Sequence, residues 1–204
     1  MKTIKLTMLV ALLMFGLTNS LTAQVSSFPH LSTFEVDLGD WVQSTFDDFD
    51  WTRDNLGTTS SGTGPQTAPY GANGTSWYIY TETSGTSNGQ TAAVNCTYDF
   101  SALLTASMDF SYYMYALNYL PGKLRVKVNG TEVWSDSVSF NGYQLANINL
   151  DAYAGQASVV IEIESVVAAT GTTFQSDNTV DEVNVTGTTS ACTGIPTAGI
   201  SSGD

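Results

Sequence analysis

The side chains with the clearest potential for ligand chemistry in this sequence are carboxylates from segments far apart along the chain. They are Asp47, Asp48 and Asp50 around Phe49, the adjacent pair Asp181 and Glu182, and Glu35. Oxygen ligands suit a hard cation such as Ca²⁺, which binds several carboxylate and carbonyl oxygens and does not need sulfur or imidazole. If the fold brings these acids together, they predict a binding module stabilised by calcium. The simpler alternative is that Asp47 or Asp50 caps a turn and that Asp181 pairs with Arg53.

Catalytic side chains are scarce, and the sequence predicts a protein that is not an enzyme. His30 is the only histidine, and it lies beside Pro29 near the expected mature N-terminus, where a Ser-His-Asp arrangement would be poorly held. One histidine and the two distant cysteines, Cys96 and Cys192, cannot supply the three protein ligands of a catalytic zinc site. A carboxylate pair of the glycosidase type stays open as an alternative, because acids from different segments can face one another.

Residues 1–23 have the pattern of a secretory signal peptide. Two lysines precede an apolar run, and Ala23 ends a cleavage-site pattern. The run is shorter than the roughly 20 apolar residues that span a bilayer, so the sequence predicts secretion or display at the cell surface without membrane insertion. Loss of the two leader lysines changes the formal net charge from −13 to −15. Such an acidic protein excludes nucleic acid and anionic lipid as partners.

The rest of the sequence has the periodicity of β-strands. Apolar and polar residues alternate in short runs between clusters of Gly, Asn, Ser and Thr, and no run outside the leader has the apolar spacing of a helix. The predicted strands are 31–36, 41–46, 77–81, 90–96, 108–115, 124–128, 132–136, 144–150, 159–166 and 179–185. Their number and spacing predict an all-β fold, a β-sandwich of two antiparallel sheets.

Two of these runs have a clear inward and outward face. The run 124–128 is followed by Asn129 and Gly130, which supply the two positive φ angles of a type I′ turn and predict a hairpin. In the run 159–166 apolar residues alternate with Glu162 and Glu164. This pattern predicts that the two glutamates lie on a solvated face.

Two long loops and one aromatic strand are the candidate recognition elements. The segments 56–73 and 83–89 are rich in Gly, Thr and Ser, and loops as long as the first usually carry function in a compact domain. In the run 108–115, Tyr113 and Tyr115 share a face that can border a shallow binding surface, although tyrosines on such a face more often serve packing alone.

The tail of the sequence, residues 188–204, has no apolar periodicity. We expect it to be a linker or the start of a further module, which leaves residues 24–187 as the folded domain. Cys96 lies in a predicted strand and Cys192 lies in this tail. The sequence leaves open whether these two cysteines form a disulfide bond.

An ordered series of motifs resembles the MAM domain family over residues 28–187. The series is Phe34-Glu35, Trp41 with Gln43, and the segments 47–53, 60–65, 77–82, 110–115 and 180–183. MAM domains are jelly-roll β-sandwiches of extracellular adhesive and receptor proteins, also found beside secreted hydrolases, and are not themselves catalytic. The resemblance therefore implies a jelly-roll fold and a role in adhesion or recognition.

The resemblance also implies a position for the calcium ion, because similar jelly rolls often bind a structural cation where the first and last strands approach each other. The residues that this comparison places around the ion are Glu35, Asp50 and Asp181, with Asp47, Asp48 and Asp37 as lesser candidates. Animal members typically carry four cysteines in two disulfide bonds. Here Thr33 and Asp40 stand beside the first two motifs instead, so that bracing is missing.

Two functions from different classes follow from the sequence. The first is a secreted, non-catalytic module that binds an extracellular protein or glycan through its loops, with Tyr70, Trp77 and Tyr119 as contacts. The alternative is a carbohydrate-active enzyme, or its accessory sugar-binding domain, in which aspartate and glutamate do the acid and base chemistry. The sequence does not identify the ligand, the oligomeric state or the neighbouring domains.

Overall fold

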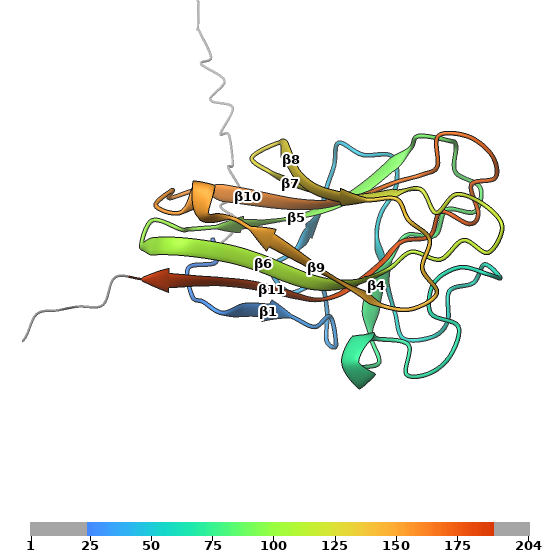
Figure 1. Ribbon diagram of the computed structural model, residues 1–204, viewed down its shortest axis with the longest axis horizontal. Helices are drawn as coiled ribbons and strands as arrows, with labels where there is room; N and C mark the ends of the chain where they lie inside the picture. Colours follow the sequence, from blue (N-terminus) through green and yellow to red (C-terminus); the bar gives the residue numbers. More distant parts are fainter. Residues whose placement is uncertain (1–23, 190–204) are drawn as a thin grey trace, which may run out of the picture.

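The computed structural model describes residues 24–189, so the predicted signal peptide and Cys192 lie outside the described residues. Figure 1 shows two β-sheets stacked face to face, with short 3₁₀ helices at Ala72–Gly74 (η1) and Asp151–Tyr153 (η2). The predicted all-β sandwich is confirmed. Within the described range, no helix has the length and apolar character needed to cross a membrane.

Each sheet combines strands from distant parts of the chain. The first sheet has the order β3 (Thr52–Asp54), β4 (Tyr78–Tyr80), β11 (Thr179–Thr189), β6 (Leu103–Tyr113) and β9 (Gln144–Asn149), and β1 (His30–Ser32) also pairs with β11. The second sheet has the order β2 (Val42–Gln43), β5 (Thr91–Tyr98), β10 (Val159–Val166), β7 (Lys123–Val128) and β8 (Thr131–Asp136). All of these strand pairs are antiparallel.

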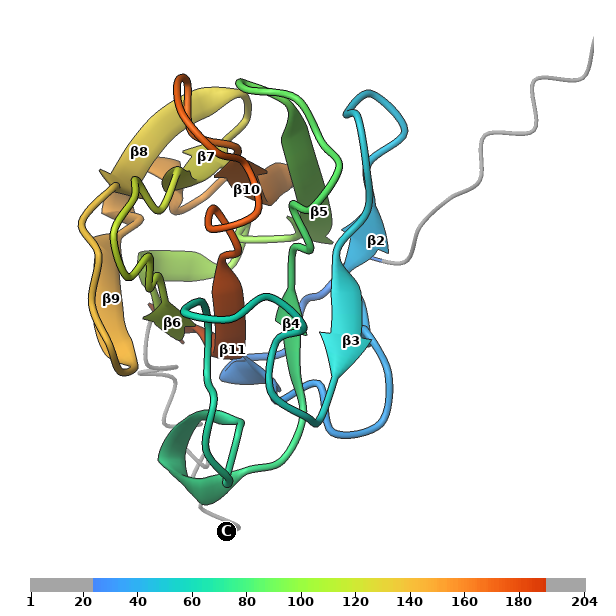
Figure 2. The same cartoon turned by 90° about the vertical axis from the view of Figure 1, so that its right-hand side faces the viewer.

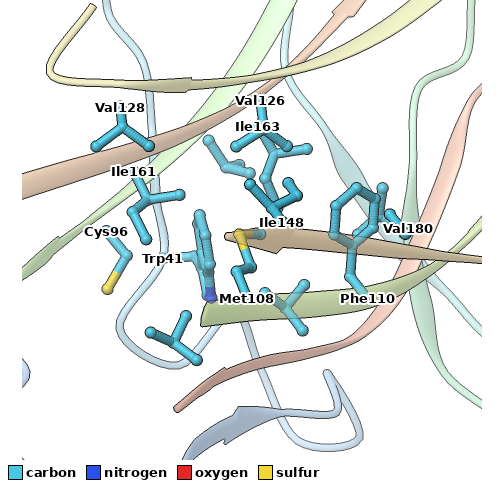
Figure 3. Packing of buried hydrophobic residues seen from close by; sticks show 14 of the residues in the cluster. Trp41, Cys96, Met108, Phe110, Val126, Val128, Ile148, Ile161, Ile163 and Val180 are labelled. Atoms are coloured by element: carbon cyan, nitrogen blue, oxygen red, sulfur yellow. The ribbon is translucent and has the colours of Figure 1, made fainter. Parts of the chain in front are cut away.

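The hydrophobic core fills the space between the two sheets (Figure 3). The alternation of apolar and polar residues along each strand explains this core, because the apolar side chains point inward and the polar side chains point outward. Phe110 and Met108 of β6 meet Val126 of β7 and Ile161 and Ile163 of β10, and all five are almost fully buried. Burial of such side chains is the main favourable contribution to folding.

The predicted hairpin at Asn129 and Gly130 is present. These two residues have φ angles of 49° and 80°, and they connect β7 to β8. The predicted strand 31–36 is shorter in the structure, because Phe34 has a φ of 56° and interrupts the extended backbone after Ser32. The short β3 was not predicted from the sequence, because it overlaps the end of the acidic motif 47–53 and contains no apolar residue.

The strand 159–166 has the predicted faces, but one of its glutamates is not solvated. Glu164 is only 6% exposed, and its carboxylate is paired with Arg125 and Lys127 of the neighbouring β7. The prediction of a solvated Glu164 is therefore wrong. Its cationic partners belong to another strand, and their long side chains cover it.

Candidate functional site

The long connecting segments gather at the end of the sandwich where β11 begins (Figures 1 and 2). They are residues 55–77, 81–90, 114–122, 137–143 and 167–178. An isolated bridge between Thr63 and Ala116 joins two of these segments. Since the segments arise from strands of both sheets, this end presents its loops on a rigid scaffold.

A hollow of about 340 Å³ lies among these loops, and we call it the tyrosine hollow. Its lining residues are Pro65, Gln66, Thr67, Pro69, Tyr113, Tyr115, Asn141, Gly142 and Tyr143. The tyrosine rings supply apolar faces, and the side-chain amide and hydroxyl groups supply hydrogen-bond donors and acceptors. A concave surface with this combination suits a small polar ligand or one unit of a larger ligand.

Two of the three tyrosines hold each other in place. The ring centroids of Tyr113 and Tyr143 are 5.4 Å apart in a T-shaped arrangement. The Tyr113 hydroxyl group donates a hydrogen bond to Oδ1 of Asn141, and the Tyr143 hydroxyl group donates to the backbone oxygen of Tyr70 at 2.8 Å. Burial raises the pKa of both phenols, so both stay protonated and uncharged at neutral pH.

A tight turn shapes the proline-rich wall of the hollow. Gly64 has a φ of 40°, and a Cβ atom at this position would lie 2.3 Å from Cγ2 of Thr58. Only glycine avoids this clash. The Nε2 group of Gln66 donates to Oγ1 of Thr58 at 2.8 Å and to the backbone oxygen of Thr63 at 2.9 Å. These bonds fix the backbone that leads into Pro65.

The buried Asp177 fastens two of the loops to the start of β11. Its Oδ1 accepts hydrogen bonds from the backbone N–H and the hydroxyl group of Thr83, at 2.9 and 2.7 Å, and its Oδ2 accepts from the Thr63 hydroxyl group at 2.9 Å. Asp177 is 0% exposed. Burial raises the pKa of its carboxyl group to about 6, and the hydrogen bonds from Thr83 and Thr63 oppose this rise.

Asp181 holds the remaining part of the longest loop in the same way. Its Oδ2 accepts from the Ala72 backbone N–H at 2.8 Å and from the Thr75 hydroxyl group at 3.0 Å. It is also 0% exposed, and burial raises its pKa to about 6. The loop 55–77, which provides the proline wall of the tyrosine hollow, is therefore anchored at both Asp177 and Asp181.

The structure brings only two of the predicted calcium ligands to a common segment. Glu35 Oε1 accepts from the backbone N–H groups of Ser76 and Trp77, at 3.0 and 2.9 Å, just beyond the residues that Asp181 holds. Each carboxylate is thus already directed at N–H or O–H donors. Glu35 and Asp181 therefore bind neighbouring residues of one loop, and their role as metal ligands stays a prediction.

The other acids lie elsewhere. Asp47 Oδ2 accepts from the Ala93 N–H at 2.6 Å, and Asp48 Oδ2 accepts from the Thr91 N–H at 2.8 Å, so both cap β5 of the second sheet. Asp50 is exposed. Residues 24–189 contain no group of three or more His, Cys, Asp or Glu side chains placed to hold a metal ion. The calcium ion stays a prediction, and any site for it in this range needs backbone oxygens as well as carboxylates.

The three predicted ligand contacts occupy separate places. Tyr70 is half-buried beside the tyrosine hollow, where its backbone oxygen binds Tyr143. Trp77 is covered by Arg53, whose guanidinium carbon lies 3.5 Å from the ring centroid. Tyr119 is 47% exposed and packs against the Phe174 ring at another part of the loop end. Each of the three residues thus contacts a different neighbour, and their role in ligand binding stays a prediction.

His30 is held more firmly than the sequence suggested. It lies in β1, where Nδ1 is 3.1 Å from the Tyr98 hydroxyl group and Nε2 is 3.1 Å from Oδ2 of Asp40. The expectation of a loosely held terminal residue is wrong, because β1 pairs with β11. Burial raises the pKa of Tyr98 well above its usual value, so this phenol is not an activated nucleophile.

Sequence reasoning found part of the tyrosine hollow and missed the rest. Tyr113 and Tyr115 were noted as the border of a shallow surface, and both line the hollow. Asn141, Tyr143 and Asp177 were not noted. The available signals were a polar turn next to an aromatic residue for Asn141 and Tyr143, and for Asp177 an acid two residues before the predicted strand 179–185.

Comparison with protein families gives a match over most of the chain. A model of the family described as "MAM domain, meprin/A5/mu" matches residues 32–193. The match covers β2 to β11 and all the loops of the tyrosine hollow.

Solved structures with a similar fold include adhesin domains of a bacterial protein. The K1 cleaved adhesin domain of Lys-gingipain from Porphyromonas gingivalis is 13% identical, has a TM-score of 0.55, and the alignment covers 79% of this chain and 99% of that domain. The K2 cleaved adhesin domain of Lys-gingipain is also 13% identical, with a TM-score of 0.50 and coverage of 78% and 98%. A family 22 carbohydrate binding module of Clostridium thermocellum Xyn10B has a TM-score of 0.49 at 10% identity, with coverage of 78% and 92%. At these identities the similarity concerns the fold.

Proposed function

The chain belongs to the MAM domain family, and from this premise we propose that it is an extracellular recognition module that binds its ligand in the tyrosine hollow. The observation that carries this proposal is the hollow itself, in which neutral tyrosines and amides line a concave surface on anchored loops. The similarity of the fold to adhesin domains supports a binding module.

The chemistry of the hollow supports a neutral polar ligand. Its lining contains no acidic and no basic side chain, so binding does not depend on an ion pair. Aromatic rings can contact the apolar face of a sugar or a protein side chain, while Asn141 and Gln66 can exchange hydrogen bonds with hydroxyl or amide groups. We therefore propose that the ligand is a glycan, or a polar segment of an extracellular protein, bound without chemical change.

The test compares two tyrosines at the same end of the molecule. Tyr115→Ala removes one wall of the hollow, and Tyr119→Ala removes an exposed tyrosine outside it. On an array of glycans and extracellular matrix proteins, we expect Tyr115→Ala to weaken binding at least roughly tenfold, as for loss of an aromatic contact. Tyr119→Ala should bind like the wild-type protein. Loss of binding in Tyr119→Ala alone would contradict the proposal and would show that the ligand binds at the exposed patch beside Phe174.

We also propose that a calcium ion stabilises the loop held by Glu35 and Asp181. These are the two predicted ligands that reach one segment of chain, through residues 72–77. An ion there would have carboxylate oxygens from β11 and from the segment that follows β1, and it would need backbone oxygens to complete its coordination. Asp47, Asp48 and Asp50 are not included, because Asp47 and Asp48 cap β5 and Asp50 is exposed.

Melting curves with and without a chelator test this ion. We expect the chelator to lower the melting temperature of the wild-type protein by several degrees, since an ion bound only by the folded state stabilises it by mass action. The variant Glu35→Gln should show no such difference, whereas the control Asp50→Asn should behave like the wild-type protein. Equal melting temperatures of the wild-type protein in both conditions would rule the ion out.

A further inference from the structure

The outer face of the first sheet carries a second hollow, of about 590 Å³, and we call it the sheet groove. It is formed by the polar faces of β6, β9 and β11 together with Asp151 of η2. It shares no lining residue with the tyrosine hollow, so it is a separate surface.

Strand register arranges the groove as rows of polar side chains. Asp109 of β6 and Asn147 of β9 are direct neighbours in the groove, and Asn184 of β11, which does not line it, is the neighbour of Asp109 on the other side. The next row on this face, two residues further along each strand, contains Thr186, Ser107 and Asn149. Neighbouring strands lie about 4.8 Å apart, so the rows present hydrogen-bonding groups at regular intervals across the sheet.

Hydrogen bonds within the groove hold these side chains in fixed orientations. The hydroxyl oxygens of Ser107 and Thr186 are 2.8 Å apart, and Nδ2 of Asn184 donates to Oδ2 of Asp109 at 3.1 Å. Each bond uses one donor and one acceptor. The second hydroxyl proton of the Ser107 and Thr186 pair, the other oxygen of Asp109, and the amide group of Asn147, which is exposed, can still bind a ligand. Pre-oriented groups lose less entropy on binding.

The composition of the groove selects the class of ligand. Asp109 and Asp151 are its only charged lining residues, so anionic ligands are repelled. The lining has no aromatic residue, and its exposed side chains are mostly hydroxyl, amide and carboxylate groups, so an apolar ligand would leave them unpaired. Polyhydroxylated chains match such groups, and a repeating polymer compensates for weak contacts at each unit by making many of them.

We propose that the sheet groove binds a neutral polysaccharide chain. An extended peptide is the less favoured ligand. Such a peptide would pair with the backbone of the edge strand β9, whereas the free groups of the groove are side chains on the face of the sheet. This proposal does not depend on the ligand of the tyrosine hollow.

The test is gel electrophoresis of the folded protein through gels that contain a polysaccharide. The neutral polymers are hydroxyethyl cellulose, galactomannan and xyloglucan, and the acidic comparison is polygalacturonate. We expect at least one neutral polymer to retard the wild-type protein and polygalacturonate to have no effect. Ser107→Trp, which fills the groove, and Asn147→Ala, which removes a free amide, should each weaken retardation roughly tenfold, as expected for loss of contacts in a solvated groove.

Matched controls make each outcome decisive. Ser135→Trp places the same bulk on an exposed position of the other sheet and should be retarded like the wild-type protein. If Ser107→Trp does not fold, Asn147→Ala decides the result.

Absence of retardation by all three neutral polymers, or unchanged retardation of Asn147→Ala, overturns the proposal. Retardation lost only in Tyr115→Ala assigns glycan binding to the tyrosine hollow. Binding of an unglycosylated peptide in place of the polymers assigns the groove to protein partners.

Discussion

At the scale of single residues, Asp177 and Asp181 show how this protein keeps carboxylates in its interior without a basic side chain as partner. Neither forms an ion pair with a Lys, Arg or His side chain in the described part of the chain. Backbone N–H groups and threonine hydroxyl groups satisfy their oxygens instead. The bonds hold the long loops, but they do not fully replace water around a charge.

These two aspartates predict an unusual pH dependence. Their pKa values rise from 3.8 to about 6 on folding, so the folded state binds their protons more tightly than the unfolded state does. Their stabilising effect is complete below the unfolded pKa and is lost as the pH rises through about 6. With a chelator present, so that no calcium ion is bound at Asp181, we expect a higher free energy of unfolding near pH 5 than near pH 7.5, measured by urea denaturation.

Substitutions connect this pH dependence to the two residues. Asp177→Asn should reduce the difference between the two pH values by on the order of 1 kcal/mol, because the asparagine does not titrate. Asp50→Asn is the matched control, since Asp50 is exposed, and it should leave the difference unchanged. A wild-type protein that becomes more stable as the pH rises over this range would contradict the assignment.

At the scale of elements, the outer face of the second sheet is joined by ion pairs between β7 and its neighbours β8 and β10. Glu164 of β10 contacts Arg125, and its Oε1 is 3.0 Å from Nζ of Lys127. Lys127 also lies 3.0 Å from Glu162, and Lys123 lies 2.8 Å from Glu132 of β8. The network concentrates basic residues on β7, in a chain with only six Lys and Arg residues.

The two glutamates of β10 differ in exposure, and we therefore expect them to differ in their contribution to the free energy of unfolding. The Glu164 side chain is 8% exposed and the Glu162 side chain is 28% exposed. We expect Glu164→Gln to lower the free energy of unfolding by about 1.5–3 kcal/mol, because it removes the buried carboxylate that accepts charge-assisted hydrogen bonds from the partly buried Arg125 and Lys127. Glu162→Gln should cost less than about 1 kcal/mol, as for partly solvated pairs. Urea denaturation of both variants measures this, and equal losses would show that burial does not control the network.

At the scale of the whole molecule, the core joins both sheets into one unit. Phe110 of β6 belongs to the first sheet and Trp134 of β8 to the second, and their ring centroids are 5.2 Å apart in a T-shaped arrangement. Strands that pair in space are often far apart in sequence, as β5 and β10 are. Because each sheet buries its apolar face in the core that both share, the two sheets depend on each other for stability.

This dependence predicts a single unfolding transition. Phe110 is fully buried, so Phe110→Ala should lower the free energy of unfolding by about 3–5 kcal/mol through the cavity that it leaves. Far-UV circular dichroism and tyrosine fluorescence should report the same midpoint in the wild-type protein and in the variant. Leu104→Ala, at an exposed position of the same strand, is the control and should have little effect. Separate midpoints for the two signals would show that the loops unfold independently of the sheets.

The fold was largely readable from the sequence, because the direction in which a strand residue points depends on its local alternation. Val126, Ile161 and Ile163 were assigned to an inward face by their spacing, and all three are buried. Asn129 and Gly130 determined their turn through their own backbone preferences. The family motifs were equally visible, since they are short and follow one another in order.

The sites were less predictable, because they depend on which strands become neighbours. Asp47 and Asp181 have the same side chain in similar acidic motifs, yet one caps β5 and the other holds a loop against β11. Glu164 lies in a pattern typical of a solvated face and is buried by cations from β7. Local sequence therefore determined the strands, the turn and the family of this protein. The order of strands in the two sheets decided which residues line the tyrosine hollow and the sheet groove, and which partner each acid has. The reason is that these residues are far apart in the sequence and no local pattern relates them.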